Sequence, residues 1–190
     1  KTIPDPGSPE FLNLPEKIKN VLKLDKPDLI ISRRVNDRET PIIIIEITHH
    51  KPVSQHIEQR MVRVIAAAEQ GVAAIYITPE LVIGSKKKDG KYVSARWPFN
   101  TKHFELMYKI GNINKVPTIF FYYPTKDGII LDDMNYPDNP KINTDESKKI
   151  FYCLSNLLQE TKNINDINFS FFNNKVVNNE FSKQISLAKK

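Results

Sequence analysis

The stretch Lys26-Pro27-Asp28-Leu29-Ile30-Ile31, followed by Ile42-Ile43-Ile44-Ile45-Glu46-Ile47-Thr48, decides the fold. The isoleucine run is far shorter than the roughly 20 apolar residues of a membrane helix, and it is typical of a strand buried on both faces. Leu29-Ile30-Ile31 predicts a neighbouring short strand, and the polar residues Arg33 to Thr40 predict a turn that joins the two. Adjacent strands lie about 4.8 Å apart, so Asp28 and Glu46 are expected to lie close together.

Further elements are predicted on both sides of this strand pair. Apolar spacing over Leu14–Leu24 favours a helix, with Pro15 suited to its first turn. A second helix begins after Pro52, with Ser54 as its N-cap, and ends at Gly71. The order strand, strand, helix, strand predicts an α/β fold in which a helix crosses over a central sheet. Beyond it we expect a strand at Val72–Thr78, a helix at Phe99–Ile110, a strand at Thr118–Tyr123 and a helix at Ser147–Thr161.

Three segments are distinguished along the chain. Residues 1–10 are predicted to be a cloning scar, because Pro6-Gly7-Ser8-Pro9-Glu10-Phe11 looks like a vector-derived linker, so the natural protein is expected to be longer. Residues 11–161 are predicted to form the α/β domain. Residues 162–190 are rich in Asn and Lys and are predicted to be a C-terminal appendage.

Composition narrows the class of function. The net charge is +6 and the pI is about 9.2, which favours a polyanionic partner such as DNA. A single cysteine, Cys153, excludes an internal disulfide framework and a cysteine-based zinc site. No apolar run is long enough for a membrane helix, and a cytoplasmic location is expected.

The two carboxylates of the strand pair point to metal chemistry. A divalent ion that promotes phosphodiester hydrolysis needs hard oxygen ligands at a fixed separation, which Asp28 and Glu46 can provide. Burying carboxylates beside isoleucine strands is costly unless a cation compensates them. Two simpler interpretations stay open: Asp28 caps a turn after proline, and Glu46 is a strand-end residue that faces solvent.

The segment from Pro27-Asp28 to Glu46-Ile47-Thr48 resembles the PD-(D/E)xK nuclease superfamily, which includes many restriction endonucleases. The resemblance covers roughly residues 14–80 and implies a restriction-endonuclease-like mixed central sheet flanked by helices. It implies that Asp28 and Glu46 bind Mg²⁺ or Mn²⁺, with the backbone carbonyl of Ile47 as a third ligand. Glu16 lies where some members carry an additional acidic ligand.

The chain departs from the family pattern at Thr48, where the family has a lysine that activates the attacking water. Lys51 is the nearest residue that could replace it. Arg60, on the following helix, could instead supply positive charge to the pentavalent phosphate. The resemblance therefore gives a catalytic set of Asp28, Glu46, Lys51 and Arg60.

Several other polar residues are candidates for binding nucleic acid. Gln55, Gln59 and Arg63 recur every four residues on the helix after Pro52, and Lys86-Lys87-Lys88 lies in a basic loop. Such lysines could contact DNA phosphates without reading the sequence. The alternative is an ordinary solvated helix face and a flexible exposed loop.

These patterns predict a divalent-metal-dependent DNA endonuclease that resembles a restriction enzyme. The second hypothesis is a catalytically degenerate nuclease fold that binds protein or nucleic acid within a larger protein, and Thr48 motivates it. A third is an unrelated α/β structural domain. DNA is the expected partner, together with a homodimer or further domains of a longer chain.

Overall fold

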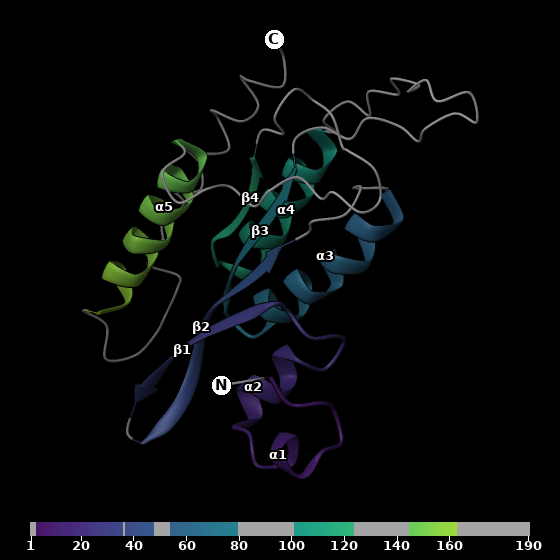
Figure 1. Cartoon of the computed structure of the whole chain (residues 1–190), viewed down its shortest axis with the longest axis vertical. Helices are drawn as coiled ribbons and strands as arrows, with labels where there is room; N and C mark the ends of the chain where they lie inside the picture. The colour runs from purple at the N-terminus through teal and green to yellow at the C-terminus, as the bar shows by residue number, and fades with distance from the viewer. Residues whose placement is uncertain (1–2, 36, 48–53, 80–100, 124–144, 163–190) are drawn as a thin grey trace, which may run out of the picture.

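The computed structural model describes residues 3–35, 37–47, 54–79, 101–123 and 145–162 (Figure 1). The predicted roles of Thr48, Lys51 and Lys86–Lys88 therefore lie outside the described residues, as does all but the first residue of the appendage 162–190. The elements are, in order, α1 (Pro9–Leu12), α2 (Glu16–Val21), β1 (Leu29–Val35), β2 (Arg38–Ile47), α3 (Ser54–Glu69), β3 (Ala73–Pro79), α4 (Thr101–Asn114), β4 (Thr118–Tyr123) and α5 (Asp145–Lys162).

The four strands form one mixed sheet in the order β1-β2-β3-β4. β1 runs antiparallel to β2, whereas β2, β3 and β4 run parallel to one another. Parallel neighbours need a long crossover, which α3 provides between β2 and β3 and α4 provides between β3 and β4. The predicted α/β fold with a mixed sheet packed against helices is confirmed.

Helices lie on both sides of this sheet. Helices α3 and α4 contact each other and pack on β3 and β4, whereas α5 lies across the sheet from α3 and packs against β4 (Figure 1). Ile42 to Ile45 of β2 are accordingly buried, and Ile43 and Ile44 are fully inaccessible. A strand covered in this way carries apolar side chains on both faces, which explains its uninterrupted isoleucine run. Within the described part of the chain, no helix is long and apolar enough to cross a membrane.

The β1–β2 hairpin is longer than predicted. Pairing continues through Arg33↔Thr40 to Val35↔Arg38, inside the segment Arg33 to Thr40 that was predicted to be a turn. The prediction was wrong because it assigned strands only to apolar segments. Backbone pairing in a solvent-exposed hairpin does not require apolar side chains. The Ser32 hydroxyl also donates to the Glu39 carboxylate across the hairpin at 2.8 Å.

The first predicted helix is shorter than its apolar spacing indicated. Helix α2 covers Glu16–Val21 rather than Leu14–Leu24. Leu22 is nevertheless buried, but Leu24 is more than half exposed, so the last apolar residue of the pattern does not belong to the core. The chain leaves the helix here to reach Pro27, which is itself buried at the entrance to β1.

Gly111 on α4 lies where the helix approaches β4 most closely. A Cβ atom at this position would come within 2.6 Å of Thr118 Oγ1 and 2.7 Å of the Val116 carbonyl oxygen. The Thr118 hydroxyl donates to the Met107 carbonyl, and the Val116 amide donates to Gly111 at 3.0 Å. The contact is therefore fixed by backbone and leaves no room for a side chain.

We expect Gly111→Ala to lower the free energy of unfolding by about 1–3 kcal/mol, the usual cost of overpacking. Without the close approach, Gly111→Ala would instead stabilise the protein by about 1 kcal/mol, because alanine is the better helix former. A lower free energy of unfolding is therefore evidence for the close approach. Urea denaturation is the measurement. Lys109→Ala on the same helix, at an exposed position, is the control and should change stability little. A Gly111→Ala protein as stable as the wild type would contradict this packing.

Candidate functional site

Asp28 lies at the entrance to β1, directly beside the buried end of β2. The antiparallel register pairs Leu29 with Ile45, so the preceding residue, Asp28, falls next to Glu46. The Ile47 amide donates to Asp28 Oδ2 at 2.6 Å, which fixes the carboxylate against β2. The side chain remains 45% exposed, so it is open to a ligand from solvent. Asp28 thus accepts a backbone hydrogen bond from the neighbouring strand.

Glu46 is a fully buried carboxylate on β2. The alternative that it faces solvent at the strand end is therefore wrong. Its Oε1 atom accepts hydrogen bonds from Arg60 Nη1 and Arg63 Nη1, which come from successive turns of α3. Its Oε2 atom is buried and has no hydrogen-bond partner among the described residues. One oxygen of Glu46 is thus neutralised while the other is left for a further partner.

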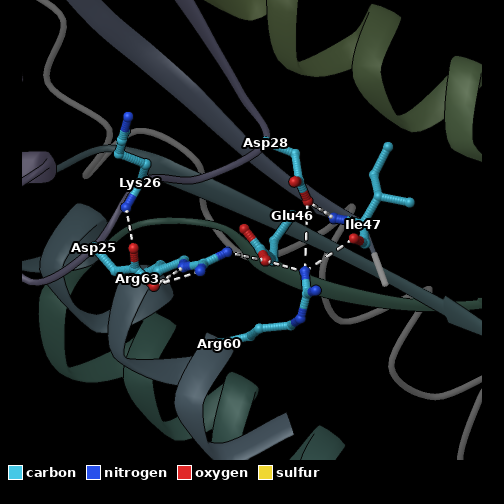
Figure 2. Close-up of polar contacts among 7 residues, drawn as sticks. All are labelled: Asp25, Lys26, Asp28, Glu46, Ile47, Arg60 and Arg63. Atoms are coloured by element: carbon cyan, nitrogen blue, oxygen red, sulfur yellow. Dashed lines mark hydrogen bonds and ion pairs between the residues drawn. The ribbon is translucent and has the colours of Figure 1, made fainter. Parts of the chain in front are cut away.

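Arg60 connects the two carboxylates and the β2 backbone. Besides Glu46 Oε1, its Nη1 atom lies 3.0 Å from the Ile47 carbonyl oxygen and 3.6 Å from Asp28 Oδ2. Figure 2 shows these oxygen atoms around the end of the guanidinium group. The structure thus brings together four residues that sequence analysis placed in the site: Asp28, Glu46, Ile47 and Arg60.

Arg63 contacts Glu46 and a carboxylate that the sequence analysis missed. Its Nε donates to Asp25 Oδ2 at 2.8 Å, and its Nη2 donates to the same oxygen. Charges therefore alternate along a chain from Asp25 through Arg63, Glu46 and Arg60 to Asp28 (Figure 2). Residues three apart on a helix share a face, which is why both arginines reach Glu46. The charge of Arg63, which was predicted to bind nucleic acid, is compensated by Asp25 and Glu46 in this structure.

Burial controls the ionisation of this cluster. The pKa of Glu46 is raised to about 7, because loss of hydration and, to a smaller extent, nearby Asp28 outweigh the opposing effect of Arg63 and Arg60. The pKa of Asp25 is lowered: its partial burial acts upward, but the hydrogen bonds from Arg63 and the Lys26 amide outweigh it. With all five groups ionised, three carboxylates and two guanidinium groups leave the cluster with a surplus negative charge.

Two polar side chains of β3 face the same side of the sheet. Tyr76 pairs with Glu46 in the parallel register, and Thr78 lies two residues further along. Both are fully buried, and neither hydroxyl has a hydrogen-bond partner among the described residues. Burial raises the pKa of Tyr76 well above its ordinary value, so the phenol stays protonated and can donate. These two side chains were not among the predicted site residues, because Val72–Thr78 was expected only as an apolar strand.

The other predicted site residues lie apart from this cluster or are not described. Glu16 is exposed on α2, forms an ion pair with Lys19 at 3.7 Å and lines a cavity of about 680 Å³ beside the β1–β2 hairpin. The structure therefore does not bring Glu16 to Asp28 and Glu46. Gln59 is exposed on α3, and Gln55 lies in the first turn of that helix, where its side chain is not described.

Comparison with known proteins adds no relative. No family model, no curated protein and no solved structure matches this chain.

The donor set at this site fits a divalent cation. Asp28, Glu46 and the Ile47 carbonyl offer hard oxygen atoms, Glu46 Oε2 has no hydrogen-bond partner among the described residues, and the cluster carries surplus negative charge when all its groups are ionised. The described residues contain no group of three His, Cys, Asp or Glu side chains placed to hold a metal. A cation here would therefore depend on two carboxylates and a carbonyl, and Mg²⁺ commonly binds proteins through only one or two carboxylates and retains water.

The raised pKa of Glu46 predicts a specific dependence of stability on pH in metal-free protein. The unfolded chain loses the Glu46 proton near pH 4.5, whereas the folded chain keeps it until about pH 7. Between these values the folded state binds more protons, so raising the pH favours unfolding. The loss is about 3 kcal/mol across the range, at about 1.4 kcal/mol for each unit of pKa difference.

Urea denaturation in EDTA at pH 5 and pH 7.5 measures this effect. Glu46→Gln cannot ionise, so its loss of stability between the two pH values should be smaller than that of the wild type by this amount. Glu69→Gln, an exposed position on α3, is the matched control and should behave as the wild type does. Equal losses in the wild type and Glu46→Gln would show that Glu46 ionises at its ordinary pKa.

Proposed function

We propose that this chain is a divalent-metal-dependent DNA endonuclease with a restriction-endonuclease-like fold. The observation that carries the proposal is the convergence of Asp28, Glu46 and the Ile47 carbonyl on a single cationic nitrogen, Arg60 Nη1. Oxygen atoms from the entrance to β1 and from the end of β2 lie around this nitrogen atom, and its positive charge already compensates the carboxylates. The resemblance of Pro27-Asp28 and Glu46-Ile47-Thr48 to the PD-(D/E)xK pattern supports the same interpretation.

In this proposal Asp28, Glu46 and the Ile47 carbonyl would hold Mg²⁺ or Mn²⁺. Such an ion, when bound, supplies a polarised phosphate and a water of lowered pKa. The Ile47 amide orients Asp28 toward the site through its 2.6 Å hydrogen bond. Arg63 remains paired with Asp25 and holds Glu46 in place. These contacts fix the carboxylates before any substrate arrives, which avoids the cost of ordering them later.

Arg60 is our candidate for the function of the family lysine, which Thr48 replaces. Its side chain is 22% exposed and borders the carboxylates, so its charge can reach a phosphate that enters from solvent. A guanidinium group also offers paired donors that match phosphate oxygen atoms. Gln59 is exposed on the same helix and could contact the backbone of DNA. The net charge of +6 favours such a polyanionic substrate.

One observation favours a second candidate function, a degenerate nuclease fold that binds a partner without cleaving it. Arg60 and Arg63 already compensate Glu46, so the buried carboxylate does not depend on a metal ion for its stability. In this case Mg²⁺ and Mn²⁺ do not bind at Asp28 and Glu46. Calorimetric titration separates the two functions, since metal binding that is lost in Glu46→Gln argues against the degenerate module.

We expect the purified protein to cleave plasmid DNA with Mg²⁺ or Mn²⁺ and to lose this activity in EDTA. Asp28→Asn and Glu46→Gln keep the size of each side chain but remove its charge. Each should lower the cleavage rate by more than about a hundredfold, because even outer partners of metal ligands contribute about 10–100-fold. Gel analysis of supercoiled plasmid is the measurement.

Glu69→Gln is again the matched control, because it makes the same change at an exposed position of α3 and should cleave at the wild-type rate. Circular dichroism establishes that each variant is folded. Cleavage by Asp28→Asn and Glu46→Gln at the wild-type rate would falsify the proposed active site. A folded wild-type protein that neither cleaves DNA nor binds metal would favour the degenerate module.

A further inference from the structure

The Arg60 guanidinium group lies where a bound cation would have to lie. Its Nη1 atom contacts Glu46 Oε1, the Ile47 carbonyl oxygen at 3.0 Å and Asp28 Oδ2 at 3.6 Å. These are the oxygen donors of the proposed metal site. Arg63 also contacts Glu46 Oε1, but its other hydrogen bonds go to Asp25 (Figure 2). Of the two arginines, Arg60 is therefore the one whose contacts match a metal ion.

We propose that Arg60 is a resident counter-ion that occupies the cation position in the metal-free protein and is displaced when a divalent ion binds. This inference rests on the proposed function, because it assumes that Asp28, Glu46 and the Ile47 carbonyl are metal ligands. It adds a competition within the protein: the same oxygen atoms bind either Arg60 or the ion. Metal affinity is then set in part by how strongly Arg60 holds its own carboxylates.

Distances and charge make the two occupants mutually exclusive. Mg²⁺ binds oxygen at about 2.0–2.1 Å, so an ion shared by these oxygen atoms would overlap the Nη1 atom that contacts them now. Two positive centres this close also repel strongly in a partly buried site. The guanidinium group neutralises only one charge, whereas a divalent ion supplies two to a cluster with surplus negative charge. The ion is thus electrostatically favoured once it reaches the site.

The surroundings allow Arg60 to leave while Arg63 stays. Arg60 has no ion-pair partner among the described residues other than Glu46 and Asp28, and its side chain reaches solvent. Arg63 is held by two further hydrogen bonds to Asp25. Glu46 Oε2 has no hydrogen-bond partner among the described residues, so it is a further oxygen atom that the ion can contact once Arg60 moves aside. The displaced guanidinium group then lies beside the site with its charge free for a phosphate.

The first test is a calorimetric titration of Mn²⁺ into the wild type, Arg60→Met and Arg63→Met. Methionine keeps an unbranched chain at each half-buried position and removes one positive charge from the cluster in each variant. The pair therefore separates displacement of the guanidinium group from a general change of charge. We expect Arg60→Met to bind Mn²⁺ at least about tenfold more tightly than the wild type, the gain from removing one charge-assisted hydrogen-bonding competitor. Arg63→Met should gain clearly less.

Four outcomes of this titration are distinct. A larger gain for Arg60→Met than for Arg63→Met supports the proposal. Equal gains would mean that only net charge matters, which overturns it. Mn²⁺ binding that is abolished by Glu46→Gln but equal in Arg60→Met and the wild type overturns the proposal and leaves the proposed function standing. Absence of Mn²⁺ binding from every folded variant, the wild type included, overturns both.

A second measurement uses the unaltered protein, in case Arg60→Met does not fold. Side-chain ¹⁵N resonances of arginine report whether a guanidinium group is held by carboxylates or rotates freely. Addition of Mg²⁺, which is diamagnetic, should shift the Arg60 resonances toward those of a mobile side chain and leave Arg63 Nε largely unchanged. Arg60→Lys serves to assign the signals. Arg60 resonances that stay constant while Mg²⁺ saturates the protein would overturn the proposal.

Discussion

Glu46 lies fully buried in the isoleucine strand β2, and an uncompensated buried carboxylate costs several kcal/mol. Two arginines of α3 offset this cost by donating to one of its oxygen atoms. The compensation constrains the fold, because both arginines must come from one helix face that packs directly on β2. Helix α3 therefore crosses from β2 to β3 on the side of the sheet toward which Glu46 points.

The register of the hairpin follows from the same end of β2. Pairing of Leu29 with Ile45 places Asp28 beside Glu46, and the Ile47 amide fixes the Asp28 carboxylate. Further along the hairpin the register shifts between Ile31 and Ser32, next to Pro41, which has no amide hydrogen to donate. Pro41 also precedes Ile43–Ile47, the part of β2 that pairs with β3. The register shift therefore lies away from the two carboxylates, and the strand pairing beside the carboxylates is regular.

Periodicity in the sequence predicted the elements that are covered by others. Helix α3, strand β3 and strand β4 each carry an apolar pattern that packing requires, and Gly71 ends α3 because its φ of 66° suits glycine. The outer half of the hairpin was not predicted, because its residues are mostly polar and their backbone pairing requires no apolar pattern. Backbone pairing between exposed polar residues is not visible in the composition of the sequence. The polar segment Arg33 to Thr40 was therefore predicted to be a turn.

Within the site, the sequence indicated the carboxylates but not their partners. Asp28, Glu46 and Arg60 stand out by motif and position, and the structure brings them together. Asp25 carries no motif, and its contact with Arg63 depends on how the chain bends between α2 and β1. Tyr76 is an aromatic residue in an apolar strand, and only its place beside Glu46 in the parallel register gives its hydroxyl a role.

In the proposed metal site, the absence of lysine at position 48 changes how stability and metal binding are coupled. A motif lysine would stand two residues after Glu46 in the sequence, whereas Arg60 stands on a helix and contacts Glu46, Asp28 and Ile47 together. Each Arg60 contact that stabilises the metal-free protein uses an oxygen atom that the proposed cation would need. By linkage, strengthening the resting ion pairs must weaken the apparent affinity for the ion by the same free energy. The proposed site therefore cannot maximise both, and Glu46 Oε2, which has no hydrogen-bond partner among the described residues, is the donor for which Arg60 does not compete.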